Sequence, residues 1–295
     1  MAGGTLYLVA TPIGNLGDVT IRAIEVLRAA PLIAAEDTRV TRRLLTHYDI
    51  QTRTTSYHAR SGPGRADELL AHLRGGHDLA LATDAGTPGI SDPGQDLAAR
   101  WAAEGGRVEA IPGASAVLVA VAVSGVAGPR WTFEGFLPRK GRERRERIAR
   151  IAADERGCVI FEAPRRLAAT ISDLKTACGP DRPAAICREL TKLHEQVVRG
   201  TLTELDALVS GGGVPSLGEA AIVIGWFSQE DAGSGHGSGH SSGGRILAAV
   251  DAEADVRAAL ARVDDLVKAG TARGEAARTV AAETGLARRQ LYRVE

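Results

Sequence analysis

The sequence predicts an α/β protein with two αβα domains, each built on a mainly parallel sheet. Two observations support this. Short apolar runs alternate with amphipathic helical segments over the first two-thirds of the chain, and polar loops rich in glycine or proline follow several of the runs. This order is typical of β-α-β units, whose parallel strands gather their ligand-binding loops at the carboxyl edge of the sheet. We therefore expect the function at that edge.

The first predicted domain spans residues 1–115 and has four runs of strand length. After the first run, Ile21, Ile24 and Leu27 recur at helical spacing, and Asp18 is suited to cap that helix. The four runs are Leu6–Ala10, Leu32–Ala35, Leu79–Thr83 and Val108–Ile111.

The second predicted domain, residues 116–227, would close an interdomain ligand cleft. The boundary is expected near the Ala/Val-rich segment Ala114–Val123, a small-residue helix able to pack tightly between two sheets. Three further apolar runs indicate buried strands: Cys158–Phe161, Ala184–Cys187 and Ala220–Ile224.

A third, small helical domain is expected at the C-terminal end. Residues 228–244 have the Gly/Ser composition of a flexible linker, and residues 245–295 form a helical tail. Its segments Ala272–Glu283 and Arg288–Arg293, with Gly285 between them, resemble a helix-turn-helix. His236 and His240 lie in the Gly/Ser run, where solvated filler is a better interpretation than a metal site.

Composition excludes several function classes. The formal net charge is zero, so any anion site must be local, and aromatic residues at 4% argue against a broad stacking platform for nucleic acid. The three cysteines are an odd set without CxxC spacing, which predicts a reduced, cytoplasmic protein. No apolar run approaches membrane-spanning length, so we expect no membrane partner.

The loop Asp84–Gly94 is the most informative segment. It holds three glycines and two prolines in eleven residues, which excludes a helix or a central strand. Glycines allow close backbone approach to a ligand, prolines stiffen the loop, and Asp84 and Thr87 add polar groups. Considered alone, it could equally be an ordinary turn.

Five more loops favour the ligand-binding interpretation, because all six would gather at strand ends and form a small-molecule cleft with room for a second substrate. The motifs GxGxxG, GxxxxGK[ST], GxSxG and HExxH are absent, so neither a metal nor a covalent nucleophile is indicated. The five loops are Thr11–Asn15, Glu36–Arg39, Pro112–Ala116, Phe161–Arg166 and Arg188–Lys192.

Six ordered blocks between residues 5 and 227 closely resemble the ribosomal RNA small subunit methyltransferase I family. That family belongs to the tetrapyrrole-methylase-like (class III) group of S-adenosylmethionine methyltransferases. A tetrapyrrole or diphthine methylase would share the fold without carrying all these blocks. The blocks are Leu6–Asp18, Ala35–Arg39, Asp84–Gly94, Ile111–Ser115, Phe133–Lys140 and Arg188–Lys192.

The resemblance implies 2′-O-methylation of a cytidine in the decoding region of 16S rRNA, with S-adenosylmethionine as the methyl donor, and a homodimer. It also implies a donor pocket between the two domains, with the segment around Gly218 and Glu219 helping to close it. The donor-binding residues carried over by motif are Pro12, Ile13, Asp84, Gly86, Thr87, Ile90, Ser115, Ala116, Ala163 and Leu190.

The ribose 2′-OH needs a group that accepts its proton or orients its oxygen, and strand-end side chains are the candidates. Glu36, Asp37 and Lys192 are the catalytic candidates that we retain, and Glu162 and Glu189 are weaker ones. Their alternative role is structural, since loop carboxylates often cap helices or pair with nearby arginines. Lys192 would act as a base only with a strongly lowered pKa.

One departure from the family concerns a His-Asn-Glu cluster that the resemblance leads us to expect. Tyr57–Gly64 keeps His58 but lacks the Asn and the Glu, so no role of that carboxylate is transferred to this chain.

A dense basic run, residues 139–147, is the predicted RNA contact, joined by the basic end of the tail. The competing interpretation is a solvated helix face, because Glu143 and Glu146 are interleaved at pairing distance. An excess of arginine over these carboxylates favours phosphate binding. The predicted RNA-binding residues are Arg139, Lys140, Arg142, Arg144, Arg145, Arg147, Arg288 and Arg289.

Two other functions stay open at this point. The same cofactor could serve a small-molecule acceptor, or the chain could be a non-catalytic ribosome-assembly factor. The basic run argues against the first, and the intact loop Asp84–Gly94 against the second.

Overall fold

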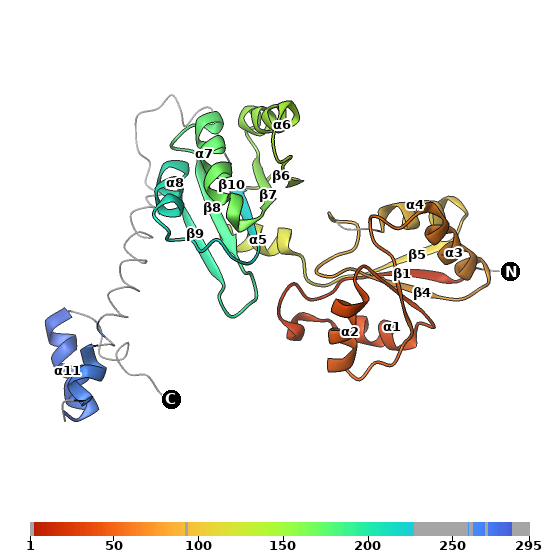
Figure 1. The fold of residues 1–295 in the computed structure, drawn as a ribbon, viewed down its shortest axis with the longest axis horizontal. Helices are drawn as coiled ribbons and strands as arrows, with labels where there is room; N and C mark the ends of the chain where they lie inside the picture. The colour runs from red at the N-terminus through yellow and green to blue at the C-terminus, as the bar shows by residue number, and fades with distance from the viewer. Residues whose placement is uncertain (1–2, 92–93, 227–258, 260–261, 269–270, 285–295) are drawn as a thin grey trace. The chain divides into compact units, whose positions relative to one another are not determined.

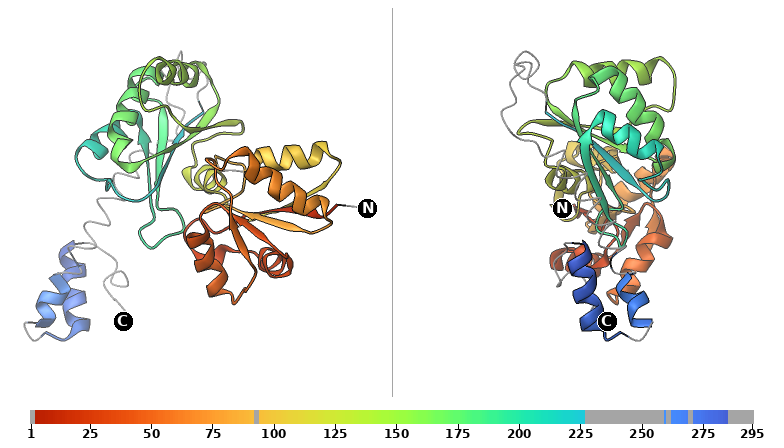
Figure 2. Two further views of the ribbon diagram at one scale, coloured as in Figure 1. Left: turned by 45° about the vertical axis from the view of Figure 1, so that its right-hand side comes forward. Right: turned by 90° about the vertical axis from the view of Figure 1, so that its left-hand side faces the viewer.

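The computed structural model describes residues 3–91, 94–226, 259, 262–268 and 271–284 (Figure 1). The chain forms two compact units, Met1–Gly233 and Ser234–Glu295. The predicted linker, with its two histidines, lies outside the described residues. The first unit contains two sheets, which Figure 2 shows from a second side with their covering helices.

The first sheet is parallel throughout, with strand order β3-β2-β4-β1-β5. The predicted α/β fold is confirmed here. The strands are β1 (Thr5–Val9), β2 (Ile33–Ala35), β3 (Thr54–Ser56), β4 (Leu79–Ala82) and β5 (Arg107–Ile111); the helices are α1 (Ile21–Ala29), α2 (Thr38–His47), α3 (Pro63–Arg74) and α4 (Gln95–Ala103).

Helices cover both faces of this sheet because its central strand is apolar on both sides. In β4, Leu79 and Leu81 pack with α3 and α4, whereas Ala80 and Ala82 pack with α1 and α2. Alternate side chains of a strand point to opposite faces, so one apolar run contributes to two cores. The carboxyl end of β4 is thereby held rigidly between four helices.

The first helix begins differently from the prediction. Asp18 lies in a short 3-10 helix, Leu16–Asp18, and Thr20 caps α1 by accepting a hydrogen bond from the Ala23 amide at 3.1 Å. The cap needs a side-chain oxygen one residue before the helix, and Thr20 occupies that position.

The second sheet has the order β6-β7-β10-β8-β9 and is mixed. Only β6 and β7 are parallel, whereas β10 runs antiparallel to both β7 and β8, and β8 to β9. The expectation of a mainly parallel sheet is therefore wrong for this half of the unit. The strands are β6 (Trp131–Phe136), β7 (Gly157–Glu162), β8 (Pro183–Arg188), β9 (Gln196–Thr201) and β10 (Ala220–Ile224).

Helix α5 (Ala116–Ser124) confirms the predicted small-residue helix. It packs against one face of the second sheet in a cluster with Val159, Ala185 and Val223. The other face is covered by α6 (Arg142–Ala153), α7 (Leu167–Cys178) and α8 (Leu202–Ser210). The predicted division at residues 115 and 227 stays a prediction.

The second unit contains α11 (Arg273–Thr284), which matches the helix predicted over Ala272–Glu283. Its apolar side packs Ala276, Ala277 and Val280 against Ala259 and Val263. The second predicted basic helix lies outside the described residues. Within the described ranges, no helix is long and apolar enough to cross a membrane.

Candidate active site

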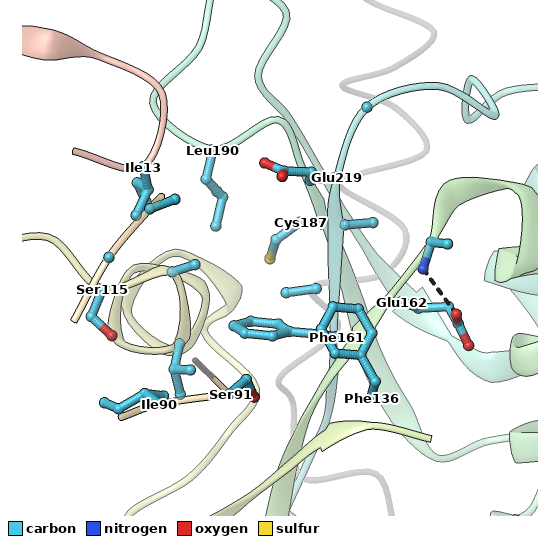
Figure 3. A pocket seen from close by; sticks show the side chains of 18 of the residues that line it. Ile13, Ile90, Ser91, Ser115, Phe136, Phe161, Glu162, Cys187, Leu190 and Glu219 are labelled. Carbon is cyan, nitrogen blue, oxygen red and sulfur yellow. Dashed lines mark hydrogen bonds between the residues drawn. The ribbon is translucent and has the colours of Figure 1, made fainter. Parts of the chain in front are cut away.

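A pocket of about 340 Å³ lies where loops from both sheets of the first unit meet, a size typical of small-molecule sites. Figure 3 shows Ile13, Ile90 and Ser115 on one side and Phe136, Phe161 and Cys187 on the other. Of the residues predicted to bind the cofactor, eight line it: Ile13, Gly86, Thr87, Ile90, Ser115, Ala116, Ala163 and Leu190.

Pro12 and Asp84, which were also predicted to bind the donor, are not among the lining residues. They directly precede Ile13 and Ala85, which do line the pocket, and the Asp84 carboxylate accepts a hydrogen bond from the Asp37 amide. Gly218 and Glu219 line the pocket as expected.

The loops of the first sheet are fastened to one another. Thr11 and Gly86 exchange two backbone hydrogen bonds of 2.9 and 3.0 Å, and the Thr11 hydroxyl donates to the Thr83 carbonyl. The Thr87 hydroxyl donates to the Ala114 carbonyl at 3.2 Å. With φ at +83°, Gly86 adopts a conformation that other residues rarely take. The three loops therefore form one preorganised wall.

Ser115 adds a neutral polar group to this wall. It precedes α5 at the N-cap position, yet its side chain makes no capping hydrogen bond, and it is buried against the pocket. The amide groups at the start of α5 also favour partial negative charge on a ligand. The Ser115 hydroxyl is thus available to a bound molecule.

The opposite wall is held in a strained loop. Leu190, which lines the pocket, lies between Glu189 at φ +51° and Thr191 at φ +65°. Non-glycine residues adopt this region only where surrounding contacts enforce it. One such contact is the Glu219 amide, which donates to the Glu189 carboxylate at 2.9 Å.

Lys192 belongs to the same loop, and its ammonium group bridges two carboxylates. Its Nζ donates to Glu189 at 2.9 Å and to Glu219 at 2.8 Å. These partners outweigh desolvation and raise the pKa of Lys192. A raised pKa does not favour Lys192 as a base, since that role requires a lowered pKa.

The aliphatic part of the Lys192 side chain also lies against Gly14, in the loop Thr11–Asn15 that follows β1. A Cβ placed on Gly14, whose φ is +155°, would lie 2.4 Å from Lys192 Cγ. Glycine at this position permits the close approach. Lys192 consequently positions loops on both sides of the pocket.

Glu36, Asp37 and Asp84 gather at the carboxyl ends of β2 and β4. The Asp84 amide donates to Glu36 Oε2 at 3.2 Å, and the Asp37 amide donates to Asp84 Oδ1 at 2.9 Å. Burial raises the pKa of Glu36 and of Asp84, whereas the Arg39 guanidinium lowers the pKa of Asp37 to about 2. Glu36 is consequently a better proton acceptor than Asp37.

The two weaker candidates are engaged structurally. Buried Glu162 accepts from the Thr170 hydroxyl at 2.6 Å and from the Ala163 amide at 2.9 Å, and it pairs with Arg166. Glu189 is held by Lys192, which lowers its pKa.

The basic run divides into two kinds of residue. Arg144 is buried and donates to Asp173 and Thr170, so the prediction that it contacts RNA is wrong. Arg147 pairs with Glu134 at 2.8 Å. Arg144 and Arg147 therefore lie on the side of α6 that packs against the protein, which the charge pattern of the sequence does not reveal. The exposed members are Arg139, Lys140, Arg142 and Arg145, of which Arg142 pairs with Glu146.

Arg288 and Arg289 lie outside the described residues. Among the residues that the structure describes, no group of three or more His, Cys, Asp or Glu side chains is placed to hold a metal ion.

Sequence reasoning did not name several of the lining residues, among them Ser91 and Phe136. Both occur in the sequence blocks that carry the family resemblance, and this is the only feature of the sequence that could have marked them as site residues. Their orientation depends on a positive φ at Ser91 and a β-bulge before Phe136, and neither is visible in the residue pattern.

Comparison with known proteins places this fold in a defined class. Residues 5–206 match the family of tetrapyrrole (corrin/porphyrin) methylases. Among solved structures, cobalt precorrin-4 methyltransferase superimposes with a TM-score of 0.58 at 19% identity, covering 75% of this chain and 95% of that one. A diphthine synthase gives a TM-score of 0.59 at 14% identity, over 75% and 90% of the two chains. These likenesses show the fold.

Sequence relatives specify the branch. The chain is 45% identical over 291 residues to ribosomal RNA small subunit methyltransferase I of Synechocystis, covering 99% of this chain and 97% of the relative. It is 41% identical over 295 residues to the Mycobacterium tuberculosis protein of that name, covering 99% and 94%. The chain belongs to the ribosomal RNA small subunit methyltransferase I family, and the resemblance seen in its six sequence blocks is confirmed.

Proposed function

We propose that this protein transfers a methyl group from S-adenosylmethionine to the ribose 2′-oxygen of a cytidine in the decoding region of 16S rRNA. The observation that carries the proposal is the pocket between the two sheets, which is built from the loops of the family blocks. The names of the relatives support a ribosomal RNA substrate.

The residues of the pocket fit the proposed donor. Apolar side chains at Ile13, Leu190 and Phe161 suit an adenine ring, and Ser115, Gly86 and Thr87 offer hydroxyl and backbone groups to the polar parts. A solved uroporphyrin-III C-methyl transferase in complex with S-adenyl homocysteine has this fold, with a TM-score of 0.54. When bound, S-adenosylmethionine supplies an electrophilic methyl group on a sulfonium.

The remaining task of the protein is to position the ribose hydroxyl and to accept its proton. Methyl transfer is an in-line displacement, so fixed geometry contributes much of the rate. We assign the proton to Glu36, which does not line the pocket but is bonded to the loop that forms its wall. The Asp84 amide donates to Glu36 Oε2 at 3.2 Å, and burial raises the pKa of Glu36, which favours proton acceptance. Asp37 keeps its charge with Arg39 and caps α2, and Lys192 holds the loops.

The RNA-binding part of the proposal rests on the exposed cations Arg139, Lys140 and Arg145. They lie just after β6 and on the solvent side of α6. Arg142 is a weaker member, since it already pairs with Glu146. Cations of this kind bind phosphates without sequence preference.

We also propose a cytoplasmic homodimer that acts on small ribosomal subunits. The apolar helix α5 supports a second copy as partner, because Leu118 on it is 58% exposed. A helix that is apolar on all sides is normally covered.

The deciding experiment measures transfer of labelled methyl from S-adenosylmethionine to purified small ribosomal subunits, mapped to one nucleotide. We expect label on a ribose 2′-oxygen of a decoding-region cytidine. Donor binding without any label would favour a small-molecule acceptor, and failure to bind the donor would favour a non-catalytic assembly factor.

A further inference from the structure

Three of the four phenylalanines of this chain form one cluster beside the pocket. Phe161 of β7 lies in the centre. The ring of Phe133 meets it edge-on at a centroid distance of 4.9 Å. The ring of Phe136 lies beside it at a centroid distance of 5.6 Å, and Figure 3 shows Phe136 and Phe161 together. In a chain with 4% aromatic residues, this concentration is a specific feature of the site.

A β-bulge aims Phe136 at the pocket. In β6, Phe133 pairs with Val159 of β7, but the next pairs are Gly135 with Ile160 and Phe136 with Phe161. One extra residue is therefore accommodated, and Phe133 and Phe136 stand two pairing positions apart, on the same face of the sheet. A regular strand would turn Phe136 to the opposite face. Bulges are used next to active sites to re-aim a side chain in this way.

The conformation of the bulge depends on glycine. Gly135 has φ +61°, and a Cβ there would lie 3.3 Å from the hydroxyl of Ser91, a lining residue on the opposite loop. The absence of a side chain lets that loop approach. Phe136 is in this way held at the junction of the two halves of the site.

Phe136 is more exposed than Ile13, Ile90 and Leu190, which also line the pocket. It is 58% exposed, against 38% for Ile90, 6% for Ile13 and 7% for Leu190. A small donor is enclosed by the buried walls. A nucleotide that belongs to a large RNA reaches only the mouth of the pocket, where this ring faces solvent.

Phosphate-binding groups follow directly in the chain. Arg139 and Lys140 are exposed, and three residues of extended chain span at most about 11 Å, so Arg139 lies within that distance of Phe136. An aromatic face beside cations is the combination that binds an unstacked nucleotide. Stacking a single base requires a single aromatic ring, so this role is compatible with a chain in which 4% of the residues are aromatic.

We propose that Phe136 is the stacking surface for the base of the nucleotide to be methylated, after that base has left its neighbours in the RNA. The inference rests on the proposed function and adds how the acceptor is held. Unstacked bases of single-stranded RNA are commonly recognised by stacking on aromatic side chains. Phe136 is here a positioning residue for the acceptor, at the exposed part of the pocket lining.

The test compares Phe136→Leu, which keeps an apolar side chain without the aromatic face, with Phe136→Tyr, which keeps the ring. We expect kcat/KM for small ribosomal subunits to fall about tenfold to a hundredfold in Phe136→Leu, in line with the loss of one stacked base, and to be retained in Phe136→Tyr. The affinity for S-adenosylhomocysteine, measured by calorimetry, should be unchanged in both. Ile21→Ala is the matched control, because it removes an exposed apolar side chain of α1 away from the pocket lining and should leave kcat/KM unchanged.

Two outcomes overturn the inference alone: wild-type kcat/KM in Phe136→Leu, or a loss of S-adenosylhomocysteine affinity equal to the loss of kcat/KM, which would assign the ring to the donor. A wild-type protein that binds the donor and leaves small subunits unlabelled overturns the proposed function itself.

Discussion

Glu36 and Asp84 form a pair of partly buried carboxyl groups, and their charged forms destabilise the native state. Burial raises the pKa of each, so the native state holds their protons more tightly than the unfolded chain does. For Glu36, the contribution of this tighter proton binding to native-state stability is fully present below pH 4.5, the ordinary pKa of a glutamate. It is lost as the pH rises through the raised pKa of Glu36. At neutral pH the charged pair therefore costs stability. Such a cost is typical of functional sites.

The residue-scale prediction concerns Glu36→Gln, which keeps an acceptor for the Asp84 amide and removes the charge. At pH 7 we expect Tm to rise by about 1–3 °C. The difference should shrink as the pH falls through the raised pKa of Glu36 and should be gone below its ordinary value of 4.5. Methyl transfer should fall about a hundredfold or more, as for loss of a general base. Thermal melts across pH, with a transfer assay, check both effects.

Asp37→Asn is the matched control for Glu36→Gln. Because Arg39 lowers the pKa of Asp37 to about 2, the charged form stabilises the native state above pH 3.8. The stability of that variant should fall at pH 7, opposite to Glu36→Gln. Full activity of Glu36→Gln would remove Glu36 as the proton acceptor.

At the scale of the element, α6 shows how one basic helix contains two functions. Arg144 lies on its inner side, with a side chain 9% exposed that bonds Asp173 of α7 and the Thr170 hydroxyl. Arg145, the next residue, is exposed. A rotation of about 100° per residue separates neighbours onto different sides of a helix. Adjacent arginines therefore have different roles.

We predict that Arg144→Ala lowers the free energy of unfolding by about 1–3 kcal/mol, since it leaves the Asp173 carboxylate and the Thr170 hydroxyl without this partner. Arg145→Ala should change that free energy by less than about 0.5 kcal/mol. It should instead weaken RNA binding and reduce the slope of log K against log salt by about one. Urea melts and binding titrations at several salt concentrations separate the two effects. Equal RNA-binding losses with no difference in stability would contradict this assignment.

At the scale of the whole molecule, α5 joins the pocket to an open apolar surface. Its first residues line the pocket, and its side chains pack on the second sheet. Leu118 is 58% exposed, and Ala122, one turn further on, is exposed too. An apolar surface of this kind on a helix next to an active site is suited to self-association.

We predict that the wild-type protein is a dimer in solution and that Leu118→Glu shifts it towards monomer without unfolding it. A charge in the centre of an apolar interface is desolvated without a partner. Light scattering after size exclusion, over a range of concentrations, measures the change. Ile21→Glu, at another exposed apolar residue, should stay dimeric. A monomeric wild type, or a dimeric Leu118→Glu, would contradict the proposed interface.

Local pattern determined much of this protein. The apolar runs predicted β1, β2, β4 and β5. The run is fully apolar in β2 and β4, whose positions are all buried, because a strand covered on both faces needs apolar side chains throughout. The glycine and proline content of Asp84–Gly94 marked the loop that lines the pocket, since backbone conformation limits which residues fit. Eight predicted donor-binding residues meet at one pocket. These features follow from the sequence because each depends on neighbours in the chain.

Only the tertiary structure decided the rest. The direction of β10 between β7 and β8 depends on long-range pairing, and an apolar run is the same in either direction. Charge alone does not tell buried Arg144 from exposed Arg145, and the pKa of Lys192 depends on carboxylates brought together by folding. The bulge that aims Phe136 arises from the register of two strands. In each case the property belongs to a contact between distant segments, and no periodicity within one segment can encode it.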